Sequence, residues 1–433
     1  MTPNAAKPIN SLPGPDDITR VELSNGITVM ARPNFNSPSV VLSGYLPGGS
    51  MYDPLDRLGL AQFTAMALNR GTERYTFQQF FGSLEAAGAS LGFGASVHNV
   101  SLGGKALAED LPLLLELVTE GLCHPVFPEE YVERLRGQLL TGLAVRAQDT
   151  GDMASITFDS LLFPDHPYGR PEEGYTETVK QISREDLAAF HAGRFSPRGL
   201  VLVVVGGVEP QRAVDEVARA LGGWIGPDAG LLPSLPAVKP LESPVRRHVQ
   251  IQGKSQCDLV MGSLGPHRCS PDYLPATLGN SVLGQFGMMG RIGDVVREQA
   301  GLAYYASTSL NAWIASGSWE VSAGVNPANL DRAADLITAE LRRFTAELVS
   351  AEELADSQAN FIGRLPISLE SNSGVANAML NLERFQLGLD YYRRYPDMVR
   401  AVTPEQILEA ARRYINPDRL VVVSAGTLAN STN

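Results

Sequence analysis

The chain has 433 residues, of which 44% are hydrophobic, a composition with enough apolar material for a buried core and a length typical of two to four domains. Its 35 basic and 47 acidic residues give a formal net charge of −12, and no run of basic residues interrupts the sequence. This balance argues against nucleic acid and anionic membrane surfaces as partners, and it is compatible with a cationic peptide.

The amino-terminal residues 1–17 are polar and Pro-rich and lack the apolar core of a secretory signal. We therefore expect a cytoplasmic protein, or a periplasmic one if a signal peptide has been removed. The longest apolar run, residues 200–205, is far below the ~20 residues that span a bilayer, so it predicts a buried strand. Three widely spaced cysteines without a Cys-x-x-Cys pair support neither a disulfide framework nor a thiolate metal site, and we interpret them as buried thiols.

The first half of the chain carries strand and helix signals in turn. Strands are expected within residues 21–31 around an Asn25-Gly26 turn, then over 40–46, 89–93 and 97–102. Helices are expected over 76–87, 110–122, 129–148 and 152–162, the first with a core stripe of Phe77, Phe80, Phe81 and Leu84. Strands paired by hairpins, with helices collected after them, indicate an α+β fold rather than a doubly wound sheet.

Two segments of the chain repeat each other. Residues 182–206 align without gaps with residues 402–426, at a constant offset of 220 (402 − 182). Each copy opens a helix with a Ser or Thr cap, ends the next turn at a Ser-Pro or Asn-Pro pair, and closes a Val-rich strand on glycine. The repeat predicts a duplicated α/β unit. We place the domains at 18–221 and 246–427, joined by the Gly- and Pro-rich linker 222–245.

One helical segment carries a recognisable pattern. Residues 59–72, preceded by Gly48-Gly49-Ser50 and Asp53, resemble the first helix of the insulinase/pitrilysin superfamily, which includes the mitochondrial processing peptidases. In that family the helix reads Gly-Leu-Ala-His-Phe-Leu-Glu-His-Met. Its two histidines bind zinc, and the glutamate is the general base for the attacking water.

The resemblance places no zinc ligand in this chain. Gln62 and Met66 stand at the two histidine positions, Ala65 at the glutamate and Gly142 at the third ligand. An amide, a thioether, a methyl group and a glycine do not form a zinc site, so we expect no metal and no other cofactor in this chain. The resemblance also implies two homologous domains over residues 18–427, each a mainly antiparallel sheet with helices packed on one face.

A second segment of the family is better preserved. Residues 290–304 are similar to its Ser-Arg-Leu…Arg-Glu-x-x-Gly-Leu-Ala-Tyr sequence, in which a helix ends at a glycine and leads into a strand. In active members the arginine and tyrosine that correspond to Arg297 and Tyr304 lie opposite the zinc and contact the substrate backbone and the developing oxyanion. Without the resemblance, Arg297 would be interpreted as a solvated or Glu-paired helix residue and Tyr304 as a core strand residue.

The glycines at 284, 287, 290 and 293 lack the Lys-Ser/Thr ending of a phosphate-binding loop. In the family, glycine-rich stretches here belong to substrate-guiding loops of the non-zinc subunit. We therefore assign Gly287, Met288, Met289 and Gly290 as candidate substrate-binding residues, with a plain flexible loop as the alternative. The six histidines show no i, i+4 pairing, and His166, in a family turn, is interpreted as structural.

Together these features predict the zinc-less subunit of a heterodimeric peptidase. A homologous partner would carry the zinc, and this chain would complete the substrate chamber and supply Arg297 and Tyr304. The alternative is a non-catalytic scaffold or peptide-binding protein that has kept the fold. The sequence gives neither the substrate and its cleavage site nor the partner, and it leaves homodimer and heterodimer open.

Overall fold

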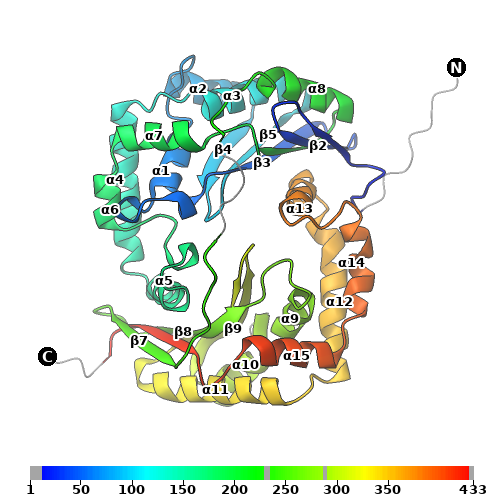
Figure 1. The fold of residues 1–433 in the computed structure, drawn as a ribbon. Coiled ribbons are helices and arrows are strands. Elements are labelled where there is room, and N and C mark those ends of the chain that lie inside the picture. Colours follow the sequence, from blue (N-terminus) through cyan, green and yellow to red (C-terminus); the bar gives the residue numbers. More distant parts are fainter. Residues whose placement is uncertain (1–11, 229–234, 286–289, 429–433) are drawn as a thin grey trace. The chain divides into compact units, whose positions relative to one another are not determined.

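The computed structural model describes residues 12–228, 235–285 and 290–428, and the chain divides into two compact units (Figure 1). The first unit comprises Met1–Thr141, Glu172–Pro233 and Gly363–Pro396, and the second comprises Gly142–Pro171, Ser234–Ile362 and Asp397–Asn433.

The first unit is built on a six-stranded sheet in the order β1-β2-β6-β3-β5-β4. Its strands are β1 (Thr19–Glu22), β2 (Thr28–Pro33), β3 (Ser39–Pro47), β4 (Ser90–Ala95), β5 (Asn99–Leu107) and β6 (Val201–Gly206). Only β2 and β6 run parallel among its pairs. The apolar run of the sequence forms β6, and all six of its residues are buried because the strand lies between β2 and β3.

Helices cover the core face of this sheet. The helices of the unit are α1 (Leu60–Ala67), α2 (Phe77–Ala86), α3 (Leu111–Cys123), α6 (Thr176–Gln181), α7 (Arg184–Arg194), α8 (Pro210–Leu221) and α13 (Asn372–Arg384). The predicted stripe of α2 is buried only in part. Phe80 and Leu84 join the core, whereas Phe77 and Phe81 are half-buried beneath the Arg70 guanidinium, 5.3 and 5.5 Å from their ring centroids.

The second unit repeats this plan with a five-stranded sheet in the order β7-β11-β8-β10-β9. Its strands are β7 (Val245–Gln250), β8 (Cys257–Gly265), β9 (Ala303–Ala312), β10 (Gly317–Val325) and β11 (Val421–Gly426). Its helices are α5 (Thr150–Leu162), α9 (Tyr273–Asn280), α10 (Arg291–Gly293), α11 (Leu330–Ala346) and α15 (Pro404–Tyr414). Three further helices have residues in both units: α4 (Glu129–Arg146), α12 (Ala351–Ser368) and α14 (Tyr391–Arg400).

The structure confirms the duplication and the α+β class. Helix α15 and strand β11 begin and end 220 positions after α7 and β6 (404 − 184), and both helices open with a capping box. In each sheet the repeated strand pairs in parallel with one neighbour and antiparallel with the other. Each sheet is thus mainly antiparallel with a single parallel pair.

The compact units do not follow the order of the chain. Helix α5 contacts β8 and β11 of the second unit, and α13 contacts β3 and β6 of the first. The Arg384 guanidinium of α13 lies 4.6 Å from the ring centroid of Tyr45 in β3. The boundaries drawn from the sequence, 18–221 and 246–427, keep each of these helices with its neighbours in sequence, and the structure divides them differently.

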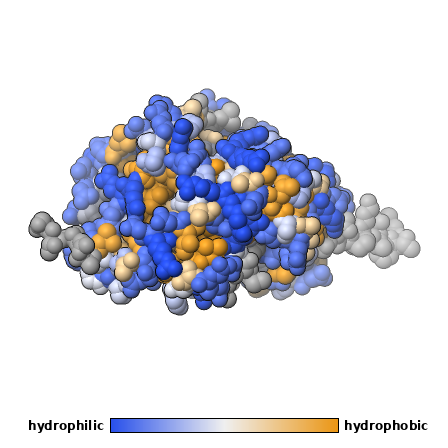
Figure 2. All heavy atoms as spheres, turned by 90° about the horizontal axis from the view of Figure 1, so that it is seen from below, coloured by the Kyte–Doolittle hydropathy of each residue, from blue (hydrophilic) through white to orange (hydrophobic). Residues whose placement is uncertain are grey.

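The cysteines, the linker, the length of the apolar helices and the surface can also be compared with the sequence predictions. None of the cysteines forms a disulfide, but the prediction of buried thiols is wrong for Cys269, which is exposed. Residues 222–228 and 235–244, the described parts of the linker, contain no helix or strand. No described helix is both long and apolar enough to cross a lipid bilayer. Hydrophilic side chains cover most of the face drawn in Figure 2, and hydrophobic ones form separate patches between them.

Candidate functional site

The helix that carries the zinc-motif positions is anchored at its start by a buried carboxylate. Helix α1 follows Gly59, whose φ of 98° places it in the left-handed region that favours glycine. The Asp53 carboxylate accepts hydrogen bonds from the backbone N–H groups of Gly59 and Ala61, both at 2.9 Å. Asp53 therefore stabilises the amino-terminal end of the helix, where N–H groups lack partners within the helix.

The three motif positions on α1 serve packing and local hydrogen bonding. Gln62 accepts a hydrogen bond from the backbone N–H of Ala95, at 2.8 Å, and so joins the helix to the end of strand β4. Ala65 has no exposed surface, and Met66 is half-buried against the core. No side chain at these positions is a base that could act on a bound water.

The position that corresponds to the third zinc ligand has free space around it. Gly142 is exposed on α4, and a Cβ atom added there would meet no other atom within 4 Å. Steric crowding therefore does not explain the glycine. Among the residues that the structure describes, no group of three or more His, Cys, Asp or Glu side chains could hold a metal ion.

The second constellation has the helix–glycine–strand form that the sequence predicts. The helical segment Asp294–Gln299 ends at Gly301, whose φ of 63° again lies in the left-handed region. The Gly301 N–H bonds to the Arg297 carbonyl and the Leu302 N–H to the Val296 carbonyl, both at 3.0 Å. This is the usual glycine cap of a helix, and strand β9 starts directly after it.

Both candidate residues of this constellation reach solvent. Tyr304 is 82% exposed on β9, an edge strand of its sheet, and its hydroxyl bonds to no other described residue. The Arg297 side chain is 38% exposed, and its Nε lies 3.6 Å from the carboxylate of the adjacent Glu298. The interpretation of Tyr304 as a core residue is therefore wrong, whereas Arg297 has the weak acidic contact of a surface helix residue.

Of the candidate substrate-binding residues, Gly287, Met288 and Met289 lie outside the described part of the chain. Gly290 is buried, and a Cβ atom added to it would lie 2.3 Å from the Cα of Gly284. The two backbones touch at this point, so close packing requires a glycine at position 290.

Two family models match the parts of the chain that contain these two segments. A family model described as insulinase (peptidase family M16) matches residues 29–160, and one described as the peptidase M16 inactive domain matches residues 181–361. The chain belongs to the insulinase family of peptidases, family M16. The match to the inactive-domain model covers Arg297 and Tyr304.

The relatives extend along almost the whole chain. A protein of Streptomyces coelicolor described as an uncharacterized zinc protease is 23% identical, covering 91% of this chain and 86% of its own. One of Mycobacterium bovis with the same description is 26% identical, with coverages of 92% and 90%. A solved peptidase M16 inactive domain from Pseudomonas fluorescens superposes with a TM-score of 0.87 at 24% identity, covering 95% of this chain and 98% of its own. A protease from Helicobacter pylori gives 0.88 at 19% identity, with coverages of 96% and 100%.

This insulinase-family member also contains a charged cavity that the sequence did not reveal. A space of about 610 Å³ in the second unit is lined by Gly290, Arg291, Asp294 and Glu353 among others. Arg291 forms two hydrogen bonds of 2.7 Å to Glu353, and these bonds lower the pKa of Glu353 to about 2. The partners are 62 positions apart on different helices, so no periodic pattern in the sequence connects them.

Proposed function

We propose that this chain is the non-zinc-binding subunit of a two-chain metallopeptidase. A homologous partner holds the zinc and cleaves a peptide bond, and this chain completes the substrate-binding surface. Arg297 and Tyr304 contact the carbonyl group of the bond being cleaved, and the residues around Gly290 take part in holding the peptide.

The exposure of Tyr304 is the observation that carries this proposal. An aromatic side chain that is 82% exposed at a sheet edge gains little from burial, so its place in this structure is not explained by the stability of the unit. At the zinc-motif positions, by contrast, Gln62 bonds to the chain itself and Ala65 is buried. The segment that carries Tyr304 is exposed to solvent and suited to contact a substrate, whereas the zinc-motif segment has no side chain that would bind a metal ion.

A guanidinium and a phenol suit the proposed role because both donate hydrogen bonds. A peptide carbonyl that is attacked by water gains negative charge on its oxygen, and preorganised donors stabilise that charge more than they stabilise the ground state. The arginine also offers parallel N–H groups that can bind two oxygens at once. The chain thus supplies donors to a reaction whose nucleophile is activated on the partner.

The test is a reconstituted complex of this chain with a zinc-bearing homologous subunit. We expect Arg297→Ala and Tyr304→Phe each to lower kcat by about a hundredfold, since the loss of one oxyanion donor costs ~3 kcal/mol. Assembly and the zinc content of the partner should not change. The matched control is Arg342→Ala, which removes an exposed arginine, paired with Asp418, from the same unit and should leave kcat unaltered.

Two results would count against the proposal. Full activity in the double variant Arg297→Ala/Tyr304→Phe would assign this chain a scaffold or peptide-binding role without chemistry. One equivalent of zinc in this chain purified alone, measured by elemental analysis, would contradict its description as the zinc-less subunit.

A further inference from the structure

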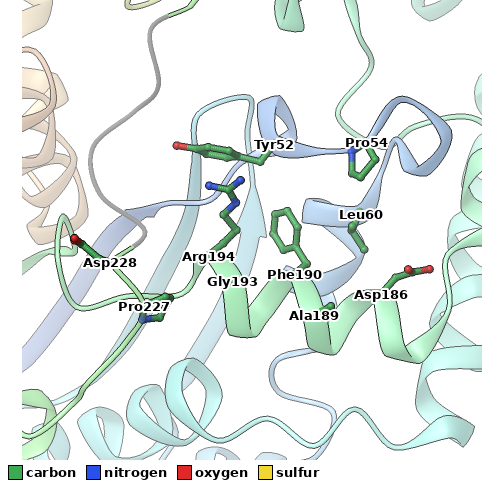
Figure 3. Close-up of a pocket in the computed structure, with 10 residues that line it drawn as sticks. All are labelled: Tyr52, Pro54, Leu60, Asp186, Ala189, Phe190, Gly193, Arg194, Pro227 and Asp228. Carbon is green, nitrogen blue, oxygen red and sulfur yellow. The ribbon is translucent and has the colours of Figure 1, made fainter.

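A second cavity lies in the first unit, apart from the residues of the proposed function. It has a volume of about 590 Å³ and opens between the loop that precedes α1 and one face of α7 (Figure 3). Leu60, Pro54 and Phe190 give it apolar walls, and Tyr52 and Arg194 lie together at one end. The volume is in the range of pockets that bind small molecules.

Arg194 carries a positive charge without an ionic partner among the described residues. Its guanidinium carbon lies 4.2 Å from the ring centroid of Tyr52, and Figure 3 shows the two groups next to each other. This cation–π contact uses none of the N–H donors in a hydrogen bond, and no described residue accepts one from them. A half-buried guanidinium with unused donors is suited to bind a planar anion such as a carboxylate.

The hydroxyl of Tyr52, whose ring Arg194 contacts, is also without a partner among the described residues. The oxygen is buried, and it forms no hydrogen bond within the described part of the chain. Burial raises the pKa of Tyr52 although the charge of Arg194 opposes the effect, so the group remains a neutral O–H donor. Buried hydroxyls in native proteins usually have a hydrogen-bond partner, and the absence of one here points to a group supplied from outside.

The two acidic residues at the cavity do not compensate Arg194. Asp186 accepts a hydrogen bond from the Ser183 N–H at 2.7 Å and another from Arg57 at 3.3 Å. Asp228 pairs with Arg198 at 2.7 Å. Because each carboxylate already has a cation beside it, the net electrostatic preference within the cavity is set by Arg194 and favours an anion.

We propose that this cavity binds a carboxylate carried on an apolar body about as large as one aromatic amino acid. The carboxylate bonds to the guanidinium edge of Arg194 and receives a hydrogen bond from Tyr52, and the apolar body packs against Leu60 and Phe190. Two sources offer this chemistry: the carboxyl-terminal residue of a peptide and a free aromatic acid. The proposal concerns a site separate from Arg297 and Tyr304 and holds whether or not the chain has a zinc-bearing partner.

Calorimetric titration of the complete chain with four probes tests this site. The probes are N-acetyl-phenylalanine, its amide, and a pentapeptide ending in phenylalanine with either a free or an amidated carboxyl terminus. We expect both acids to bind and both amides to bind at least about tenfold more weakly, because an amide places no negative charge on Arg194. Tighter binding of the peptide acid than of N-acetyl-phenylalanine identifies a peptide terminus as the source, and the reverse identifies a free acid.

Three variants assign the interaction to its residues. Arg194→Gln should weaken the binding of the acids about tenfold or more, and Tyr52→Phe should weaken it several-fold while the aromatic ring remains. Arg219→Gln is the control, since it removes an exposed arginine from helix α8 of the same unit and does not line this cavity. Unchanged thermal unfolding of each variant shows that its fold is intact.

The proposal is overturned if acid and amide probes bind the wild-type chain equally, a comparison that depends on no variant. It is also overturned if none of the probes binds at concentrations up to about 10 mM, or if Arg194→Gln binds the acids as the wild type does. Acetate alone binding as tightly as N-acetyl-phenylalanine would contradict the role of the apolar walls.

Discussion

Two carboxyl groups meet between helix α5 and the sheet of the second unit. Burial, and then the neighbouring Glu320, raise the pKa of Asp159 to about 8. Glu320 is buried on β10 with hydrogen bonds from Asn311 and Ser318, and burial raises its pKa as well. Near neutral pH, Asp159 therefore keeps its proton in the folded protein, because two adjacent buried carboxylates cannot both be charged without a large cost.

This pair predicts that stability declines with rising pH. In the unfolded chain Asp159 ionises near pH 4, whereas in the folded protein it ionises near pH 8, so the unfolded state binds fewer protons between these values. The free energy of unfolding should fall across that window. Asp159→Asn removes the effect and should gain up to about 5 kcal/mol over the wild type at pH 8, because each unit of pKa difference is worth ~1.4 kcal/mol, with little gain at pH 4.

Urea denaturation at several pH values checks this prediction. Asp152→Asn is the control, because Asp152 is exposed on the same helix and should show no gain that depends on pH. A constant difference between Asp159→Asn and the wild type from pH 4 to pH 9 would show that Asp159 ionises at its ordinary pKa.

At the scale of elements, the segment that leads into Arg297 depends on a contact between two backbones. Gly284 and Gly290 touch, and Gly290 is the N-cap residue of the short helix α10, with its carbonyl accepting the Asp294 N–H at 3.0 Å. A side chain at 290 would push this helix away from its neighbour. Since φ at Gly290 is −112°, crowding alone and not backbone strain sets the requirement.

Gly290→Ala should therefore destabilise the protein by about 1–3 kcal/mol, the usual cost of overpacking. Gly142→Ala is a matched comparison, because that glycine lies in a helix with open space around it and alanine there should stabilise by roughly 0.5–1 kcal/mol. Chemical denaturation measures the change in the free energy of unfolding for both variants, which should be negative for Gly290→Ala and positive for Gly142→Ala. A neutral Gly290→Ala would mean that the contact relaxes without cost.

At the scale of the whole molecule, each compact unit contains a helix from the other half of the chain. Helix α13 buries Val375, Ala376 and Met379, and α5 packs Phe158 against Gly262 of β8. Burial of one large aliphatic or aromatic side chain contributes about 1.5–3 kcal/mol, which is large beside the 5–15 kcal/mol of net stability typical of a domain, so the loss of either helix should destabilise its unit strongly.

Halves cut in the linker should consequently fold poorly. Residues 12–228 lack α13 and residues 235–428 lack α5, so each half exposes the sheet face that its missing helix covers. We expect either half alone to aggregate or to unfold without a cooperative transition, and the two halves produced together to associate. Size-exclusion chromatography and circular dichroism measure both. A half that melts cooperatively at the temperature of the complete chain would contradict this expectation.

The sequence alone determined the family, the duplicated α+β fold and the residues at the zinc-motif positions. These depend on local signals: hydrophobic periodicity, capping residues and side-chain chemistry at fixed spacing, all of which are written along the chain. It also predicted the glycine-capped helix before β9. The core stripe that it predicted for α2 is confirmed for Phe80 and Leu84, whereas Phe77 and Phe81 are only half-buried, because the solvent-facing side of their rings is covered by the Arg70 guanidinium instead of by core side chains.

Only the tertiary structure decided which distant residues share an environment. Contacts between residues far apart in the sequence depend on the tertiary fold. Examples are the pairing of Arg291 with Glu353, the proximity of Asp159 and Glu320, and the packing of α5 and α13 in the unit of the other half of the chain. The same holds for Arg194, because only the folded structure shows that no described acidic side chain pairs with its guanidinium. Local patterns cannot encode such relations, because electrostatic energy and burial depend on distance in the folded protein and not on separation along the sequence.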